Sequence, residues 1–225
     1  MIGHTTPFLW LEPNGFRYFL MHRVDKKILD IEKLLTEKYR LFNAPAAARD
    51  IGRILLGEPL DYVMGWTPFL DLDIDLLLRP FIPRPETEYW VGEAIKELRK
   101  RFQGRRLEIL DIFSGSGCIG TAALKCIPKS RVTFAEKTPR FVEQIKLNLI
   151  KNKLPARRYR VCHSDFFRNV KGRFDVILAN PPYVGAIQRL DPEVKKYEPR
   201  AAYYGGRGGL SAIKRFLREA RRFVK

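Results

Sequence analysis

Residues 107–120 decide the fold, and they read LEILDIFSGSGCIG. The first part of this stretch is a short apolar run typical of a buried strand, and a helical pattern follows it as far as Cys126. Between the two, Gly115, Gly117 and Gly120 fit the spacing GxGxxG. Because glycine has no Cβ atom, such a turn lets the backbone come close to a nucleotide or a similar ligand. The spacing alone also fits a tight strand-to-helix turn that binds nothing.

Strand and helix signals alternate on both sides of this turn. Short apolar runs predict strands over residues 107–112, 132–135, 160–163 and 174–178. Helical periodicity predicts helices over residues 86–102, from the glycine turn to 126, over 138–152 and over 211–224. Strands separated by helices in this order imply a parallel sheet with right-handed crossovers. The predicted fold class is therefore α/β and Rossmann-like.

The residues before this sheet predict two further parts. Apolar positions at helical spacing predict a helix over 25–42, and Asn43 can cap a second helix that ends at Gly57, whereas the first 24 residues show no clean period. Residues 71–76 alternate aspartate with leucine or isoleucine, which predicts a β-hairpin. We therefore expect a small helical domain (1–61), a linking β-hairpin (62–83) and an α/β domain (84–225).

The formal net charge of +17 is concentrated in the C-terminal part of the chain. Residues 1–83 contain 10 basic and 11 acidic side chains, whereas residues 84–225 contain 32 basic and 14 acidic ones. Such an excess attracts polyanions or acidic proteins without identifying which. The last predicted helix fits either a contact with nucleic acid or the ribosome or a solvated outer face, because one side of it carries Lys214, Arg215, Arg218, Arg221, Arg222 and Lys225.

Composition excludes several classes of protein. With 45% hydrophobic residues the chain can form a core, which excludes disorder by composition. The three cysteines form no CxxC pair, and the three histidines have no ligand spacing with them, so we expect a reducing compartment and no metal site. No stretch of about 18 apolar residues and no signal-peptide pattern is visible, so we expect a cytoplasmic protein without a membrane span.

Acidic side chains stand at the ends of successive predicted strands. Glu136 ends the second strand, 25 residues after Asp111, and can accept hydrogen bonds from both hydroxyls of a ribose. Asp165 follows the next strand and can accept a hydrogen bond from an adenine amino group. Each acid alone is more often a helix cap or a solvated charge. Because parallel strands end in one crevice, the three acids together favour a ligand that contains adenosine.

Residues 180–183 read Asn-Pro-Pro-Tyr and directly follow the fourth predicted strand. A planar amide or aromatic amine is a poor nucleophile because its nitrogen lone pair is delocalised. The Asn180 side-chain oxygen and the Pro181 carbonyl can accept both N–H groups and favour the pyramidal nitrogen of a transition state, while Tyr183 can stack on the planar group. The prolines position these acceptors in advance. The tetrapeptide predicts transfer chemistry on an NH2 group, and the plainer reading is a rigid turn.

From about Gly57 to Leu210 the chain resembles class I S-adenosylmethionine-dependent methyltransferases, and most closely the HemK/PrmC family of protein-glutamine N5-methyltransferases. This family modifies the glutamine of the Gly-Gly-Gln motif in peptide chain release factors. Besides the glycine turn and NPPY, the likeness includes GEPLDYVMG (57–65), IPRPETE (82–88), EPRA (198–201) and the pair Gly205-Gly206. The run RPETE is its specific part, because NPPY also occurs in DNA adenine and some RNA methyltransferases.

The resemblance implies S-adenosylmethionine as cofactor, a release factor as substrate, residues 1–61 as a substrate-docking domain and residues 84–225 as the methyltransferase domain. It implies cofactor binding by Asp111, Phe113, Ser114, Gly115, Ser116, Gly117, Glu136, Lys137, Asp165, Phe166 and Asn180. It implies that the glutamine amide is held by the predicted catalytic residues Asn180, Pro181, Pro182 and Tyr183. It implies that the cleft for cofactor and substrate is lined by Arg84, Pro85, Glu86 and Thr87.

The sequence departs from this family at three places. Glycine is usual where Phe113 stands, so we expect a different first bend in the loop. The part before Gly57 is shorter than in typical members. A typical member continues with further strands where this chain stops at Lys225, so we expect a sheet that is truncated at its C-terminal side. The fourth strand is then an exposed edge unless another segment covers it.

Three functions remain open from the sequence. The favoured one is methyl transfer from S-adenosylmethionine to the Gly-Gly-Gln glutamine of a release factor, by a monomeric enzyme. The second is adenine-N6 methylation of DNA or RNA, which shares the nitrogen chemistry and would use the basic half of the chain. The third is binding of the cofactor or of a partner without turnover. Methyl-transfer assays with a release factor and with nucleic acids separate them.

Overall fold

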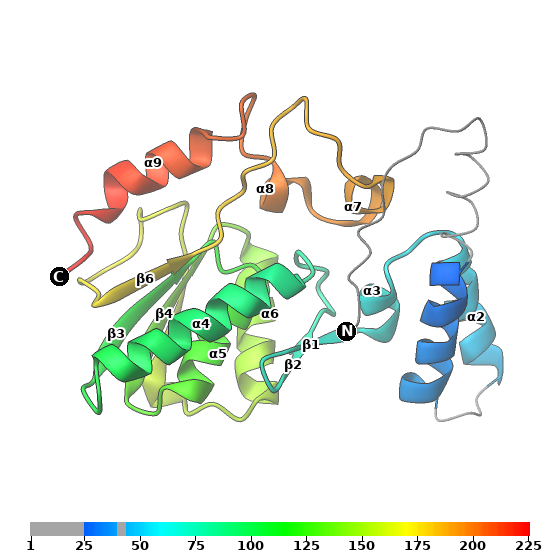
Figure 1. The fold of residues 1–225 in the computed structure, drawn as a ribbon, viewed down its shortest axis with the longest axis horizontal. Helices are drawn as coiled ribbons and strands as arrows, with labels where there is room; N and C mark the ends of the chain where they lie inside the picture. The colour runs from blue at the N-terminus through cyan, green and yellow to red at the C-terminus, as the bar shows by residue number, and fades with distance from the viewer. Residues whose placement is uncertain (1–24, 40–43) are drawn as a thin grey trace, which may run out of the picture. The chain divides into compact units, whose positions relative to one another are not determined.

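The computed structural model describes residues 25–39 and 44–225 (Figure 1). The chain divides into two compact units, Met1–Val63 and Met64–Lys225. In the described residues, the smaller unit is helical and all strands belong to the larger unit.

The smaller unit is built from short helices. Residues 25–33 are α-helical and continue into the π-helical turn η1 (Leu34–Lys38), and α2 (Ala44–Leu55) and α3 (Leu60–Met64) follow. The helix predicted from residue 25 is thus confirmed as far as Lys38, and the second helix ends before Gly57 as predicted. The cap predicted at Asn43 lies outside the described residues. Leu34 and Ile54 are fully buried and form part of the apolar interior.

A buried carboxylate stabilises the smaller unit. Asp50 accepts hydrogen bonds from Lys38 Nζ (2.7 Å), the Tyr39 hydroxyl (2.7 Å) and a guanidinium nitrogen of Arg53 (2.9 Å). Burial raises the pKa of Asp50, but these three donors outweigh it and lower that pKa to about 2. Asp50 therefore ties the end of η1 to α2.

A β-hairpin opens the larger unit. It consists of β1 (Trp66–Phe69) and β2 (Leu72–Asp75), paired antiparallel. The alternation predicted over 71–76 is confirmed, because the leucine and isoleucine side chains are buried and Asp73 is exposed. Two buried amides of α6 (Pro139–Lys151) hold the hairpin: Gln144 donates to the Asp75 carbonyl (2.8 Å), and Asn148 accepts from the Asp75 N–H (2.6 Å). Polar groups thus fix the hairpin to the α/β core.

Four parallel strands form the sheet of the larger unit, in the order β5-β4-β3-β6. They are β3 (Leu107–Ile112), β4 (Ser130–Glu136), β5 (Tyr159–His163) and β6 (Val176–Ala179). The register places Ile112 between Ala135 and Ala179, so β3, β4 and β6 end at one edge. The predicted strands and their parallel arrangement are confirmed, and the fold is α/β and Rossmann-like.

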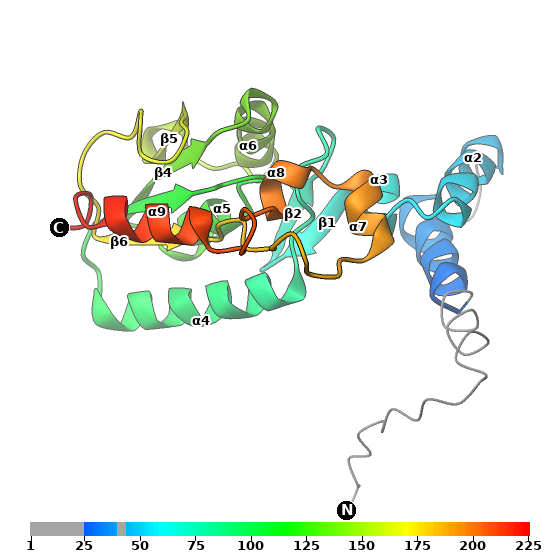
Figure 2. The ribbon, with the colours of Figure 1, turned by 90° about the horizontal axis from the view of Figure 1, so that it is seen from above.

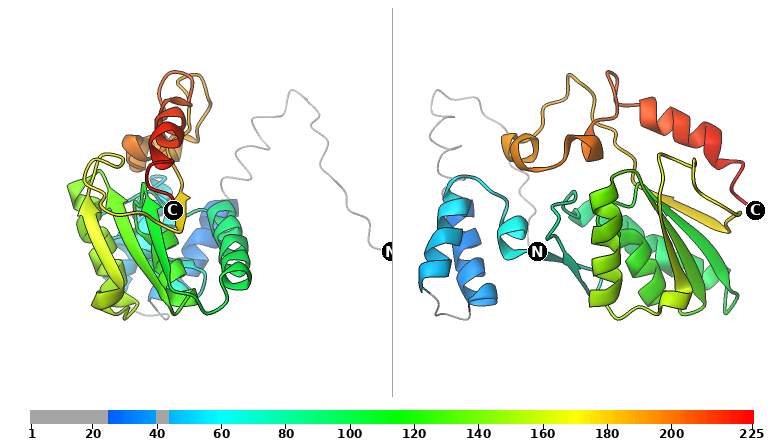
Figure 3. Two further views of the ribbon diagram at one scale, coloured as in Figure 1. Left: turned by 90° about the vertical axis from the view of Figure 1, so that its left-hand side faces the viewer. Right: turned by 180° about the vertical axis from the view of Figure 1, so that it is seen from behind.

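Helices cover both faces of this sheet. On one face, α5 (Cys118–Cys126) packs on β3 and β4 and lies between α4 (Pro85–Arg101) and α6 (Figure 2). On the other face, the segment 164–174 and α9 (Ser211–Ala220) pack on Leu110 and Ile112 (Figure 3). Because side chains of a strand alternate between faces, β3 is buried on both sides, as its apolar sequence requires.

β6 lies at the edge of the sheet, where the fourth strand was predicted to be. Residues just before β6 pair with the last residues of the chain: the Phe174 N–H donates to the Phe223 carbonyl (2.7 Å), and the Lys225 N–H donates to the Phe174 carbonyl (2.9 Å). Lys225 Nζ also lies 2.9 Å from an Asp175 carboxylate oxygen. The end of the described chain therefore covers the beginning of this edge.

Short helices fill the remaining connections. They are η2 (Ala156–Arg158) before β5, and α7 (Pro192–Tyr197) and α8 (Arg200–Tyr203) between β6 and α9. Within residues 25–39 and 44–225, no helix combines the length and the hydrophobicity needed to cross a bilayer.

Candidate active site

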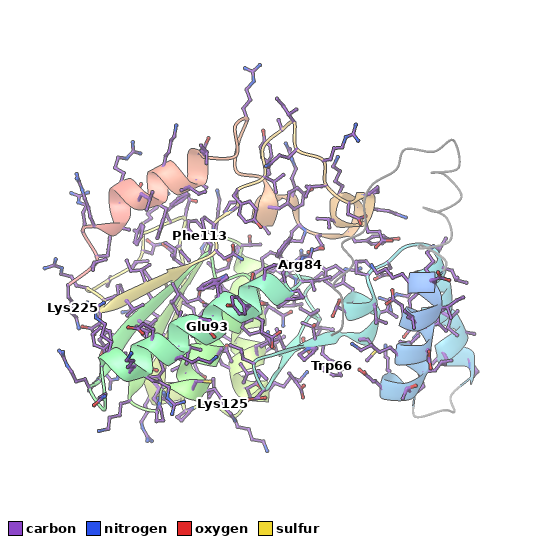
Figure 4. The ribbon with its side chains drawn as sticks, viewed as in Figure 1. Trp66, Arg84, Glu93, Phe113, Lys125 and Lys225 are labelled. Atoms are coloured by element: carbon purple, nitrogen blue, oxygen red, sulfur yellow. The ribbon has the colours of Figure 1, made fainter. Side chains whose placement is uncertain are left out.

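A cavity of about 870 Å³ lies where β3, β4 and β6 end. Most of the predicted site residues line it, and Figure 4 labels two of them, Arg84 and Phe113. The others are Glu86, Thr87, Ser114, Gly115, Ser116, Glu136, Lys137, Asp165, Phe166, Asn180, Pro181, Pro182 and Tyr183. Three predicted residues do not line the cavity: Pro85, Asp111 and Gly117.

The glycine loop brings α5 unusually close to the sheet. A Cβ atom on Gly120 would lie 2.3 Å from the Phe134 ring and 2.8 Å from an Asp111 carboxylate oxygen, so only glycine fits there. Gly117 is the N-cap of α5 and has a φ of 80°, a left-handed conformation that glycine adopts without strain. The GxGxxG spacing is therefore explained by the tight turn and by helix packing, while Ser114, Gly115 and Ser116 face the cavity.

Phe113 has a left-handed backbone conformation, which residues other than glycine rarely adopt. Its φ is 61°, which costs a residue with a side chain roughly 1–2 kcal/mol. The ring packs edge-on against Phe166, at 5.0 Å between centroids, and against Phe216 of α9, at 5.9 Å. The loop thus has a left-handed bend at Phe113, and the aromatic packing offsets part of its strain.

Asp111 supports the loop from behind the cavity. One carboxylate oxygen accepts a hydrogen bond from the Gly120 N–H (2.9 Å), and the other is buried and has no hydrogen-bond partner among the described residues. Burial raises the pKa of Asp111 to about 8, and the nearby charge of Glu136 adds to the effect. A protonated Asp111 would carry a donor on the unpaired oxygen.

Glu136 clamps the loop from the end of β4. Its two carboxylate oxygens accept backbone N–H groups from Gly115 (2.9 Å) and Thr138 (2.7 Å). Each carboxylate oxygen has a second lone pair, so the side chain can still accept hydrogen bonds from the hydroxyl groups of a ligand in the cavity. Glu136, which was predicted to contact a ribose, therefore lines the cavity and has free lone pairs for such a contact.

The Asp165-Phe166 pair forms one end of the cavity. Asp165 lies 3.2 Å from Lys137 Nζ and 3.3 Å from a guanidinium nitrogen of Arg215. Burial raises the pKa of Asp165, but the two cations outweigh it and hold that pKa below its ordinary value. The Arg215 guanidinium also lies 3.9 Å from the centre of the Phe166 ring, a cation–π contact.

Arg215 is a cavity residue that the sequence did not reveal. Helical periodicity groups it with the basic residues on the outer side of 211–224, but its guanidinium turns onto Asp165 and Phe166. No motif precedes or follows it, and the contact joins residues 50 positions apart. Only the three-dimensional structure identifies it.

The NPPY bend places Asn180 against the first turn of α4. The Asn180 Nδ2 group donates a hydrogen bond to the hydroxyl of Thr87, at 3.3 Å, and Thr87 is buried. The Asn180 side-chain oxygen makes no hydrogen bond to the described residues, so it is available to a ligand. Tyr183 is 60% exposed and lines the same cavity.

A glycine segment backs the bend. Val184 pairs with Tyr204 in an isolated bridge, and a Cβ atom on Gly205 would lie 2.6 Å from the Pro182 carbonyl oxygen. Gly205 therefore permits a close approach to Pro182 and Tyr183 of the bend, whereas Gly206 packs against Ser211. This contact connects the bend to the residues that lead into α9.

A partly buried ion pair joins two walls of the cavity. Arg84 pairs with Glu198, whose second carboxylate oxygen accepts the Ile82 N–H at 3.1 Å. The Arg84 guanidinium also lies 4.6 Å from the centre of the Phe81 ring. The runs RPETE and EPRA, which the sequence shows far apart, thus form one structural unit.

Cys118 also lines the cavity. Burial raises the pKa of its thiol to about 12, which keeps the sulfur protonated and unreactive at neutral pH. In the part of the chain that the structure describes, no three His, Cys, Asp or Glu side chains are grouped to hold a metal ion.

Comparison with known proteins identifies similar chains. The family described as methyltransferase small domain matches residues 94–195. The release factor glutamine methyltransferase of Koribacter versatilis is 37% identical over 169 residues, which cover 73% of this chain and 58% of that protein. The release factor glutamine methyltransferase of Bifidobacterium longum is 31% identical over 237 residues, which cover 99% of this chain and 76% of that protein.

Comparison with a solved structure shows the same fold. The hMettl16 catalytic domain, determined in complex with a MAT2A 3'UTR hairpin, matches with a TM-score of 0.50 and 18% identity over 68% of this chain and 58% of that one. The sheet order, the helices on its two faces and the cavity at the strand ends define a class I methyltransferase fold. At the level of sequence, the chain belongs to the release factor glutamine methyltransferase family. It spans 58% and 59% of the length of two curated relatives.

Proposed function

We propose that this protein transfers a methyl group from S-adenosylmethionine to the side-chain amide nitrogen of the glutamine in the Gly-Gly-Gln motif of a peptide chain release factor. One observation carries the proposal. The Asn180 side-chain oxygen has no partner among the described residues, in a cavity that also contains the glycine loop and two strand-end carboxylates. Family membership supports the same substrate.

The residues around the glycine loop fit an adenosine-bearing cofactor. Glu136 would accept the ribose hydroxyls, and Asp165 would accept the adenine amino group. Phe113 and Phe166 offer apolar faces beside the adenine position. When bound, S-adenosylmethionine supplies an electrophilic methyl group on a sulfonium.

Asn180 and Pro181 would prepare the acceptor nitrogen. The Asn180 side-chain oxygen and the Pro181 carbonyl accept the two N–H groups of the glutamine amide and orient its nitrogen. These acceptors interact best with the nitrogen as it loses planarity and gains positive charge, so they stabilise the transition state more than the ground state. Thr87 keeps the Asn180 amide in the required orientation by accepting its N–H. Tyr183 would stack on the flat amide at the mouth of the cavity.

The helical unit would dock the release factor. Lys27 Nζ donates to the Leu55 carbonyl (2.8 Å), which joins the helix of residues 25–33 to the end of α2. Large apolar side chains next to this contact are exposed: Ile28 (58%), Leu29 (63%), Leu55 (55%) and Leu56 (74%). We infer that these side chains form one apolar patch, and such a patch typically marks a protein contact. Because the chain belongs to the release factor glutamine methyltransferase family, we take the docked protein to be a release factor.

Mass spectrometry of a release factor incubated with the protein and S-adenosylmethionine tests the proposal. We expect one methyl group on the glutamine of the Gly-Gly-Gln peptide. A release factor with alanine in place of that glutamine should gain none. Parallel reactions with DNA and RNA distinguish adenine methylation from glutamine methylation. Methyl transfer to nucleic acid and not to the release factor would contradict the proposal.

A further inference from the structure

A second cavity, of about 740 Å³, lies between α9 and the segment that follows β5. Five arginines line it: Arg168, Arg215, Arg218, Arg221 and Arg222. Figure 4 shows nitrogen-tipped side chains projecting from α9 on the side away from the sheet. The only acidic side chains in the lining are Asp165 and Glu219. We call this cavity the arginine pocket.

Both carboxylates of the arginine pocket are already engaged. Arg215 bonds to Glu219 at 2.8 Å and to Asp165 at 3.3 Å. The other four guanidiniums form no hydrogen bond or ion pair with the described residues, and all four side chains are exposed. Like charges gathered in one hollow raise the local positive potential and favour a polyanion.

The chemistry of the lining favours phosphate over carboxylate polymers. A guanidinium donates two parallel hydrogen bonds to one phosphate, and arginine is the preferred residue for that contact. Phe223 is half-buried in the same lining and stacks on Phe167 with 4.5 Å between ring centroids. An aromatic side chain beside guanidiniums offers a nucleobase a surface to stack on, which an acidic peptide cannot use.

We propose that the arginine pocket binds the phosphate backbone of single-stranded RNA. The choice of RNA over DNA rests on the proposed function, because a peptide chain release factor works in translation. The NPPY bend does not line this pocket, so the RNA is a docking partner and not the methyl acceptor. Asp165 and Arg215 line both cavities, so the docked RNA would lie next to the cofactor site.

Fluorescence anisotropy with a labelled single-stranded RNA tests this pocket without cofactor or release factor, so its outcome is independent of methyl transfer. The test variant is Arg218→Glu/Arg222→Glu. The matched control is Lys100→Glu/Lys125→Glu, which changes the net charge equally on exposed residues of α4 and α5. Figure 4 labels Lys125, on the side of the sheet away from α9.

We expect the test variant to bind RNA at least about tenfold more weakly and the control to bind within about twofold of the unchanged protein. The logarithmic salt dependence should also become shallower by about 1.4 in the test variant, as for two lost contacts to single-stranded phosphates. Arg218→Gln/Arg222→Gln should weaken binding in the same direction and serves if charge reversal prevents folding.

Four outcomes would overturn the proposal. The first is no RNA binding by the unchanged protein at about 50 mM salt, and the second is equal weakening of binding in the test and control variants. The third is displacement of the RNA by poly-glutamate as effectively as by unlabelled RNA. The fourth is tighter binding of single-stranded DNA of the same sequence than of the RNA. The third outcome would assign the pocket to an acidic protein, and the fourth would assign it to DNA.

Discussion

The guanidinium of Arg84 and the carboxylate of Glu198 form an ion pair, although 114 residues separate them in the chain. The Glu198 side chain is 1% exposed and that of Arg84 is 32% exposed. Since Glu198 also accepts the Ile82 N–H, one carboxylate fixes the residues that precede α4 to those that follow α7. The shape of the candidate active site therefore depends on this pair.

Replacing Glu198 by glutamine should destabilise the larger unit. Glu198→Gln keeps the shape of the side chain but leaves Arg84 without its partner charge, and we expect the free energy of unfolding to fall by about 1–3 kcal/mol, since Arg84 is partly solvated. Urea denaturation measures this. Glu93→Gln removes the exposed pair with Lys96 on α4 and should leave the denaturation midpoint unchanged. Equal midpoints for the two variants would contradict the structural role of Glu198.

Removing the Asn180 amide should abolish turnover without loss of cofactor binding. Asn180→Ala deletes the acceptor oxygen, and the loss of one such group typically lowers kcat about 10²–10³-fold. Calorimetry should give an S-adenosylmethionine Kd within about twofold of the unchanged protein. Thr87→Val, which removes only the group that orients the amide, should lower kcat less. Full activity of Asn180→Ala would refute the role assigned to the bend.

Replacing Arg215 should weaken cofactor binding. Arg215→Gln removes the cation that positions the Phe166 ring and the Asp165 carboxylate, two side chains proposed to hold the adenine, so we expect the Kd for S-adenosylmethionine to rise about fivefold, a loss of about 1 kcal/mol of binding free energy. Lys214→Gln, on the exposed side of the same helix, is the control and should bind the cofactor normally. If both variants bind alike in calorimetry, Arg215 is not part of the cofactor site.

Polar substitutions on the helical unit should weaken the reaction with a whole release factor but not the reaction with a short peptide. Leu29→Gln/Leu56→Gln should raise the KM for a release factor about tenfold, because two exposed apolar side chains would no longer be buried in the complex. The rate on a short Gly-Gly-Gln peptide should not change. Leu77→Gln alters an equally exposed leucine of the larger unit and should leave both values unchanged. A loss of peptide activity in the double variant would indicate a structural defect instead of a docking role.

Asp111 should make the stability of the larger unit depend on pH. Its pKa is about 8 in the folded state against 3.8 for the ordinary side chain, so between these values the folded state holds a proton that the unfolded state has lost. Raising the pH through this window therefore lowers the free energy of unfolding, by at most about 1.4 kcal/mol per pH unit. Asp111→Asn keeps an acceptor for the Gly120 N–H and should flatten the profile. Parallel denaturation profiles for the two proteins would contradict the protonated state of Asp111.

The parts predictable from sequence are those that local patterns encode. Apolar runs and glycine spacing sufficed for the strands, the parallel sheet and the loop after β3, because these depend on neighbouring residues. Whether the first bend differs from that of the family stays a prediction; Phe113 itself has a left-handed φ of 61°, and packing on Phe166 and Phe216 offsets part of the local strain. Local preference was overridden there by tertiary contacts.

The site residues were harder to assign because their roles depend on distant partners. Asp111 was predicted to bind the cofactor; in the structure it does not line the cavity and accepts a hydrogen bond from Gly120, and a direct contact with the cofactor stays a prediction. Arg215 was grouped with the outer basic residues, but it turns onto Phe166. A helical period gives the side of a helix and not the reach of a long side chain, so the contact of Arg215 could not be predicted from spacing. For Asp111, the sequence gives its position at a strand end but not whether its side chain faces the cavity or the packed helix α5.

Asp165 and Arg215 stand in the wall between the two cavities and face both of them. A ligand that binds Asp165 or Arg215 in one cavity changes the hydrogen bonds that the same side chain can make to a ligand in the other cavity. Thermodynamic reciprocity then requires each occupant to alter the affinity of the other by the same factor. One carboxylate and one guanidinium would thus couple the affinity for the nucleoside to the affinity for the nucleic acid, and this coupling requires no movement of the backbone.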